Sequence, residues 1–152
     1  MSRKHDIIAQ YYASTRMPFP LQKYLKRWDW PRDYKTIVNA GGRKKRGVTH
    51  KGKTWYPDVV IVDGKNKVRE MAEIELEEDI TKQSIQKWQA LSETTGMGPR
   101  GHKKLFLCVP KSKSRLVRKM LEDNRIDYAG LRSFVVTEMG EIRLTVETNL
   151  DP

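Results

Sequence analysis

The chain has 152 residues and a formal net charge of +11, because 30 lysines and arginines outnumber 19 aspartates and glutamates. Its single cysteine excludes an intrachain disulfide and a multi-cysteine zinc site, and no apolar run is long enough to cross a bilayer. We therefore expect one globular domain, 1–152, in a cytoplasmic, reducing setting, with a polyanion such as nucleic acid as partner and no membrane contact.

The first third of the chain reads as helices followed by a strand. Helical spacing predicts a helix over 3–15, and a shorter one is expected at 21–28. β-Branched and aromatic residues predict a strand over 34–40, which Gly41 and Gly42 end. The residues expected to face inward from the first helix are Ile7, Ile8, Tyr11 and Tyr12.

A basic segment follows at 41–53, and its glycines and low apolar content predict a flexible loop between two strands. Its cations are candidates for contacts to nucleic-acid phosphates: Arg43, Lys44, Lys45, Arg46, Lys51 and Lys53. A solvated basic surface is the alternative interpretation. Trp55 and Tyr56 come next, and either base stacking or core packing suits them.

An acidic hairpin is predicted at 56–79. The apolar run 59–62 and the alternating run 72–76 read as two strands around an Asp-Gly-Lys-Asn turn. If Asp63 pairs with Val68, Asp58 lies opposite Glu73, and Glu75 shares the face of Glu73. Like charges directly opposite each other are destabilising, and a divalent cation that prefers carboxylate oxygens would hold them.

The rest of the chain alternates helices with strands. Helices are expected at 79–94, with Asp79 as N-cap, and at 112–124, with strands at 104–109, 131–137 and 141–148. The continuous apolar run at 104–109 is typical of a strand buried on both faces. This order predicts an α/β fold, with a mixed β-sheet flanked by helices.

Pro57-Asp58 followed by Glu73-Ile74-Glu75 on the next strand resembles the motif of the PD-(D/E)xK nuclease superfamily. Asp58 matches the motif aspartate and Glu73 the (D/E) position, whereas Glu75 stands where a lysine is usual. Some restriction enzymes of the superfamily carry glutamate there and still cut. The element order is also similar to the restriction-endonuclease-like core.

The resemblance implies a Mg²⁺- or Mn²⁺-dependent endonuclease acting on duplex or branched DNA, with a homodimer as a possible assembly. The ion would be held by Asp58, Glu73, the Ile74 carbonyl and Glu75, and Glu75 would alternatively accept a proton from the attacking water. The missing lysine would come from the following helix, where Lys82 is the candidate catalytic residue and Lys87 the other choice.

Two further interpretations remain open. A catalytically inactive nucleic-acid-binding module with the same fold would explain the absence of the motif lysine. A basic structural protein, with the acidic strand as a subunit contact, is the third interpretation. Three histidines show no ligand spacing and are expected to contact phosphate or solvent: His5, His50 and His102.

Overall fold

The computed structural model describes residues 3–17 and 33–152, so the helix expected at 21–28 lies outside the described residues. The described part contains three α-helices, a six-stranded sheet and a two-stranded sheet. The elements are α1 (Arg3–Arg16), β1 (Lys35–Val38), β2 (Val48–His50), β3 (Lys53–Trp55), β4 (Val59–Val62), β5 (Val68–Ile74), η2 (Glu77–Asp79), α2 (Gln83–Thr94), β6 (Leu105–Pro110), η3 (Lys111–Lys113), α3 (Ser114–Asp123), β7 (Gly130–Val136) and β8 (Ile142–Asn149).

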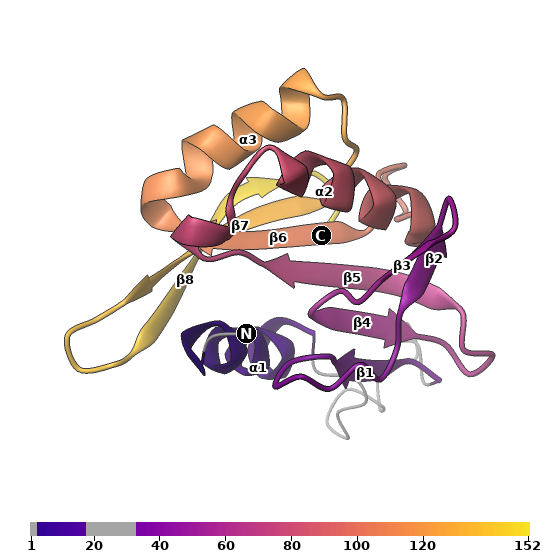
Figure 1. Cartoon of the computed structure of the whole chain (residues 1–152), viewed down its shortest axis with the longest axis horizontal. Helices are drawn as coiled ribbons and strands as arrows, with labels where there is room; N and C mark the ends of the chain where they lie inside the picture. The colour runs from indigo at the N-terminus through magenta and orange to yellow at the C-terminus, as the bar shows by residue number, and fades with distance from the viewer. Residues whose placement is uncertain (1–2, 18–32) are drawn as a thin grey trace.

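The large sheet has the strand order β1-β4-β5-β6-β7-β8. The central pairs β5–β6 and β6–β7 are parallel, and the other pairs are antiparallel. Helices α2 and α3, which connect the parallel strands, lie on one face, and α1 lies on the other (Figure 1). The expected α/β class with a mixed, helix-flanked sheet is therefore confirmed. No helix among the described residues is long and apolar enough to cross a membrane.

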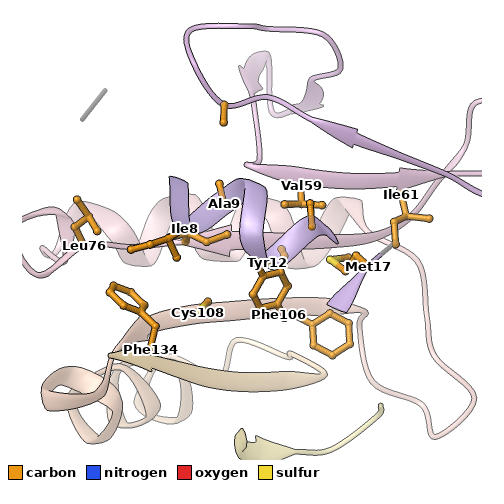
Figure 2. Close-up of a cluster of buried hydrophobic side chains, with 14 of the residues drawn as sticks. Ile8, Ala9, Tyr12, Met17, Val59, Ile61, Leu76, Phe106, Cys108 and Phe134 are labelled. Carbon is orange, nitrogen blue, oxygen red and sulfur yellow. The ribbon is translucent and has the colours of Figure 1, made fainter. Parts of the chain in front are cut away.

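Helix α1 packs on its face of the sheet through a narrow stripe (Figure 2). Ile8 and Tyr12 are buried as expected, whereas Ile7 and Tyr11 are exposed. The expectation for Ile7 and Tyr11 was wrong, because Ala9 and Ala13 complete the buried stripe in their place. The buried positions recur at intervals of three and four residues, the spacing of one helical face: His5, Ile8, Ala9, Tyr12 and Ala13.

The opposite face holds the second half of the core. Trp88 of α2 and Leu121 of α3 are fully buried there against β5 and β6. Residues 105–109 of β6 are buried on both sides of the sheet, which confirms the expectation for this strand. Because helices cover both faces of the sheet, side chains buried between the layers are shielded from water. A polar side chain buried there therefore needs a specific hydrogen-bond or charge partner.

The β4–β5 hairpin keeps the expected register only over part of its length. Val59 pairs with Ala72 and Ile61 with Glu70, which places Asp58 next to Glu73. Nearer the turn the register shifts, Val62 pairs with Val68, and the expected pair of Asp63 with Val68 is wrong.

The turn itself explains this shift. The Asp63 carboxylate accepts hydrogen bonds from the N–H groups of Lys65 and Lys67, at 2.9 and 3.0 Å, while Asn66 adopts a positive φ of 61°. The Asp63 N–H also donates to the Lys67 carbonyl at 3.0 Å. These bonds close a longer turn than expected, and a bulge in β5 restores the register beyond it.

The basic segment 41–53 is not a simple loop. It contains β2, and Lys53 begins β3, so that the two strands form a small hairpin packed against α2. Lys51 and Gly52 both have positive φ, at 50° and 79°, as a tight two-residue turn requires.

The start of the segment is fixed by the buried side chain of Asn39. Its amide donates to the carbonyls of Arg46 and Pro57, and its oxygen accepts from the N–H groups of Lys45 and Arg46. The expectation of a flexible loop was therefore wrong, because one buried amide satisfies four backbone groups.

Helix α2 begins four residues later than expected. Asp79 closes the short 3₁₀ turn η2 and is not the N-cap, which Lys82 occupies. The Ser84 hydroxyl instead links the two segments, since it donates to the Asp79 carbonyl and accepts from the Thr81 N–H.

Candidate metal-binding site

Asp58, Glu73 and Glu75 lie on one cavity of about 580 Å³ at the end of the sheet. Asp58 stands immediately before β4, Glu73 lies near the end of β5, and Glu75 directly follows that strand. All three are buried, with 5%, 4% and 1% of their surfaces exposed. The cavity is also lined by residues of four other segments, among them His5 of α1, Tyr56 before β4, Glu78 of η2 and Lys87 of α2.

Asp58 and Glu73 are held together by backbone hydrogen bonds that cross the hairpin. The Asp58 N–H donates to Glu73 Oε1 at 2.9 Å, and the Ile74 N–H donates to Asp58 Oδ2 at 2.8 Å. Each carboxylate therefore takes its orientation from the backbone of the opposite strand. Both groups are buried at this end of the sheet, where these bonds fix their position.

His5 also belongs to the site. The sequence had led us to expect a contact with phosphate or solvent for this histidine, and that expectation was wrong. Its side chain is buried, and Nε2 lies 3.1 Å from Asp58 Oδ2 and 3.0 Å from the Ile74 carbonyl oxygen. Since a carbonyl oxygen only accepts, Nε2 carries a proton in this geometry. Asp6 lies beside it, with Oδ1 at 3.4 Å from Nδ1, and does not line the cavity.

On the other side of the acids, Lys87 contacts both glutamates. Its Nζ lies 3.1 Å from Glu73 Oε2 and is hydrogen-bonded to Glu75 Oε1. The Glu75 N–H donates to the Cys108 carbonyl at 3.0 Å, which fixes its backbone on β6. Lys82, the candidate named from the sequence, is exposed at the N-cap of α2 and does not line the cavity. The structure thus brings Lys87, the other choice named from the sequence, to the acids, and not Lys82.

The site holds more carboxylates than cations, and its protonation reflects this. Burial and the charge of Glu73 raise the pKa of Asp58 well above its usual range. Burial and Glu73 likewise raise the pKa of Glu75 to about 7, against the opposing effect of Lys87. Burial would lower the pKa of His5, but its hydrogen bond to Asp58 and the negative charges nearby raise it to about 9.

Burial would raise the pKa of Glu73 as well, but the Lys87 ammonium and the hydrogen bonds at Asp58 lower it. Glu73 is therefore the acid best stabilised as a carboxylate. Burial acts in the opposite direction on Lys87, where the charges of Glu73 and Glu75 hold the pKa above its ordinary value. The negative charge of Glu73 and Glu75 is thus balanced mainly by one cation that they share, Lys87.

The oxygens of this site suit a hard divalent cation. Mg²⁺ is commonly held by one or two carboxylates with waters completing an octahedral shell, and Asp58, Glu73 and the Ile74 carbonyl supply such donors beside a cavity. The side-chain oxygen Glu75 Oε2 is buried without a hydrogen-bond partner among the described residues. In the same described ranges, no group of three or more His, Cys, Asp or Glu side chains is already arranged as a ligand set.

The cations proposed from the sequence lie in different settings. Arg43, Lys44 and Lys45 are exposed. Arg46 is hydrogen-bonded through its guanidinium to the carbonyls of Gly47 and Asn66. Lys53 lies on β3, with Nζ 4.0 Å from the centre of the Trp55 ring, and Lys51 lies in the hairpin turn.

The aromatic residues beside these cations connect the basic segment to the cavity. Trp55 is half-buried and packs with the α2-side core, as one of the two interpretations expected. Tyr56 is exposed, lines the cavity, and has Lys44 Nζ 5.4 Å from the centre of its ring. The basic segment therefore approaches the acids through two consecutive aromatic residues.

Comparison of the chain with family models, curated proteins and solved structures found no match.

Proposed function

We propose that this protein is a metal-dependent endonuclease that hydrolyses DNA phosphodiester bonds, with a restriction-endonuclease-like fold of the PD-(D/E)xK type. The observation that supports it most is the convergence of Asp58, Glu73 and the Ile74 carbonyl with Lys87 on one cavity. Burying two carboxylates side by side costs stability even where cations such as His5 and Lys87 pair with them. A function at this site explains why they are there.

In this proposal Asp58, Glu73 and the Ile74 carbonyl hold a Mg²⁺ or Mn²⁺ ion. The ion would supply positive charge to the phosphoryl oxygen and activate the attacking water. Lys87 takes the place of the motif lysine: its ammonium, partly exposed beside the cavity, stabilises negative charge that develops on the phosphate. Glu75 holds that ammonium in position and excludes water behind it.

His5 has a positioning role. Its Nε2–H donates to Asp58 Oδ2 and to the Ile74 carbonyl, two of the oxygens offered to the ion. A cation that took both oxygens would therefore displace this hydrogen bond. The imidazole keeps the two oxygens aligned until the ion arrives.

DNA is the substrate in this proposal because the chain carries a large excess of positive charge and because exposed Lys44 lies over the ring of Tyr56, which lines the cavity. Arg43, Lys44 and Lys45 follow β1 and precede the β2–β3 hairpin, which ends at Trp55. Phosphates on both sides of the scissile bond would contact this segment. Arg46 has a structural role instead, since its guanidinium is used by backbone carbonyls.

A nucleic-acid-binding module without activity is the second candidate, and the Lys87 contacts are the observation that favours it. An ammonium shared by Glu73 and Glu75 neutralises charge within the fold without any ion. In that case the protein binds DNA, but added metal changes nothing.

Cleavage of plasmid DNA with added Mg²⁺ or Mn²⁺ separates the two candidates. The endonuclease proposal predicts metal-dependent nicking that Asp58→Asn or Glu73→Gln lowers by about 10³-fold or more, because a lost ligand removes several kcal/mol of stabilisation at the transition state. Glu77→Gln, in an exposed carboxylate outside the cavity, is the matched control and keeps full activity. Salt-sensitive DNA binding without cleavage would establish the inactive module.

The basic segment has its own test. Replacing Arg43, Lys44 and Lys45 with alanine removes about 0.9 log unit of salt dependence for each phosphate that the protein no longer neutralises, so the slope of log affinity against log salt should fall by about two to three units. The control changes Arg115, Arg118 and Lys119 on α3 to alanine, which removes the same charge. If the α3 variant shows the flatter slope and the other keeps the wild-type slope, the DNA-binding surface lies elsewhere.

A further inference from the structure

In the part of the chain that the structure describes, strand β8 is an edge strand of the main sheet. Within the described residues it pairs with β7 alone, and its eight residues make it the longest strand there. It contains no proline or glycine. Proteins usually protect such edges with short strands, prolines, bulges or charges, because unpaired N–H and C=O groups invite another strand. Here a register shift beside Glu147 disturbs only the last part of β8, and 142–146 is regularly paired.

The hairpin formed by β7 and β8 also exposes apolar side chains. Val135, Val136, Met139 and Val146 are 45%, 41%, 89% and 45% exposed. The hairpin extends beyond the rest of the sheet, at the left of Figure 1. Apolar residues gathered on one protruding element are typical of an interaction surface, whereas single exposed ones are ordinary.

The backbone of β8 presents its free groups at specific residues. The Thr137 N–H donates to the Glu141 carbonyl at 2.9 Å, so the peptide groups of Glu141 face β7. Hydrogen-bonding direction alternates along an antiparallel strand. Residues 143 and 145 therefore also face β7, while the peptide groups of Leu144 and Val146 point to the open edge.

We propose that the open edge of β8 binds a second copy of this chain, antiparallel and around a two-fold axis at Thr145, so that the two sheets become continuous. In this register Leu144 lies opposite the partner's Val146, and their outward peptide groups pair. Arg143 lies opposite the partner's Glu147, which stands at the register shift and whose carboxylate also accepts a hydrogen bond from the Ser133 hydroxyl at 2.8 Å. The pattern repeats by symmetry, as an isologous interface requires.

The charges select this register over its neighbour. Moving the axis by one residue to Leu144 would set Glu141 against the partner's Glu147, and like charges directly opposite each other are destabilising. The axis at Thr145 instead makes two pairs of opposite charge and two apolar pairs. A second copy fits because the segment is complementary to itself. An unrelated peptide would not be expected to match both the charges and the apolar residues of this edge. The inference is independent of any catalytic activity.

A disulfide test reads this register directly in the full-length chain. The partner positions of residue 145 would lie about 4.5–5.5 Å apart between Cα atoms, which suits a disulfide, and Thr145→Cys should cross-link to a dimer on oxidation. The matched control is Arg143→Cys, whose two copies would be about 13 Å apart and should not cross-link. The native Cys108 is fully buried and does not compete.

Sedimentation or light scattering over a range of concentrations supplies the second measurement. The wild-type chain should show a concentration-dependent dimer, and Val146→Lys should be monomeric with an unchanged circular dichroism spectrum, since this side chain is half exposed. A wild-type chain that is monomeric throughout would overturn the proposal. Equal cross-linking of both cysteine variants, or a dimer that Val146→Lys does not weaken, would overturn it as well.

Discussion

The β4–β5 and β7–β8 hairpins belong to the same sheet, but the first buries charged side chains and the second exposes apolar ones. The β4–β5 hairpin lies inside, covered on both faces, yet it buries Asp58, Glu73 and Glu75 at one end. The β7–β8 hairpin lies at the edge and exposes Val136 and Met139. Charged groups are rarely buried and large apolar groups are rarely gathered on a protruding element, so each hairpin departs from what stability alone favours.

The two hairpins differ in how they affect the stability of the fold. Buried carboxylates cost stability, and their partners His5 and Lys87 come from helices on opposite faces of the sheet. The site therefore depends on the packed fold around it. The exposed residues of β7–β8 cost the monomer little, because they are not part of its core. Mutations at the two hairpins should accordingly have very different effects on stability.

The largest effect is expected at Lys87. Lys87→Ala leaves Glu73 and Glu75 buried without their cation, which should lower the free energy of unfolding by about 3 kcal/mol. Lys82→Ala, an exposed lysine five residues earlier, is the matched control and should change it by less than about 0.5 kcal/mol. Urea unfolding measures both, and equal values would contradict the account of the acids.

A second change tests whether the loss at Lys87 comes from uncompensated charge. Adding Glu75→Leu to Lys87→Ala removes one of the two carboxylates that were left unpaired. The double variant should recover about half of the lost stability, because a buried charge no longer needs a partner. A double variant less stable than Lys87→Ala would show that packing, and not charge, explains the loss.

A smaller effect is expected at His5. His5→Ala removes the donor to Asp58 Oδ2 and to the Ile74 carbonyl and should lower the free energy of unfolding by about 2 kcal/mol. His102→Ala is the control, since that ring contacts Asp127 in a half-exposed position. Thermal melting of both variants at one pH would decide, and a larger loss at His102 would argue against a positioning role for His5.

The smallest effect belongs to the edge hairpin. Met139→Ser should change the free energy of unfolding by less than about 0.5 kcal/mol, because the side chain is almost fully exposed. Val60→Ala, on the fully buried strand β4, should lower it by about 2 kcal/mol. These values are for the monomer, so unfolding is measured at a protein concentration too low for dimers. A loss at Met139 as large as that at Val60 would remove the contrast between the hairpins.

Much of the fold was accessible from the sequence because local patterns determine it. The β-branched runs and the alternation of helices and strands predict most elements, and Asp58 was expected beside Glu73. The longer turn was not predicted, because it depends on how the Asp63 carboxylate caps two particular amides. The hairpin of β2 and β3 was missed for a similar reason: its strands are short and polar, and their packing on α2 supplies what their sequence lacks.

The candidate site was less accessible because its helical residues are distant in sequence. His5 meets Asp58 and Ile74 across 53 and 69 residues. One signal for His5 was present: it shares the helical stripe of Ile8 and Tyr12. Lys87 was expected only as the second choice after Lys82, and its contacts with Glu73 and Glu75 join residues 14 and 12 positions apart in the chain.

The central claim is that Asp58 and Glu73 hold a divalent cation, and a Mn²⁺ titration by calorimetry tests it most directly. Wild-type protein and the Glu77→Gln control should each bind Mn²⁺ at a site that Asp58→Asn weakens by at least about tenfold, since even outer partners of metal ligands contribute that much. Equal binding by wild type and Asp58→Asn, or no binding by the folded wild-type chain, would contradict the account.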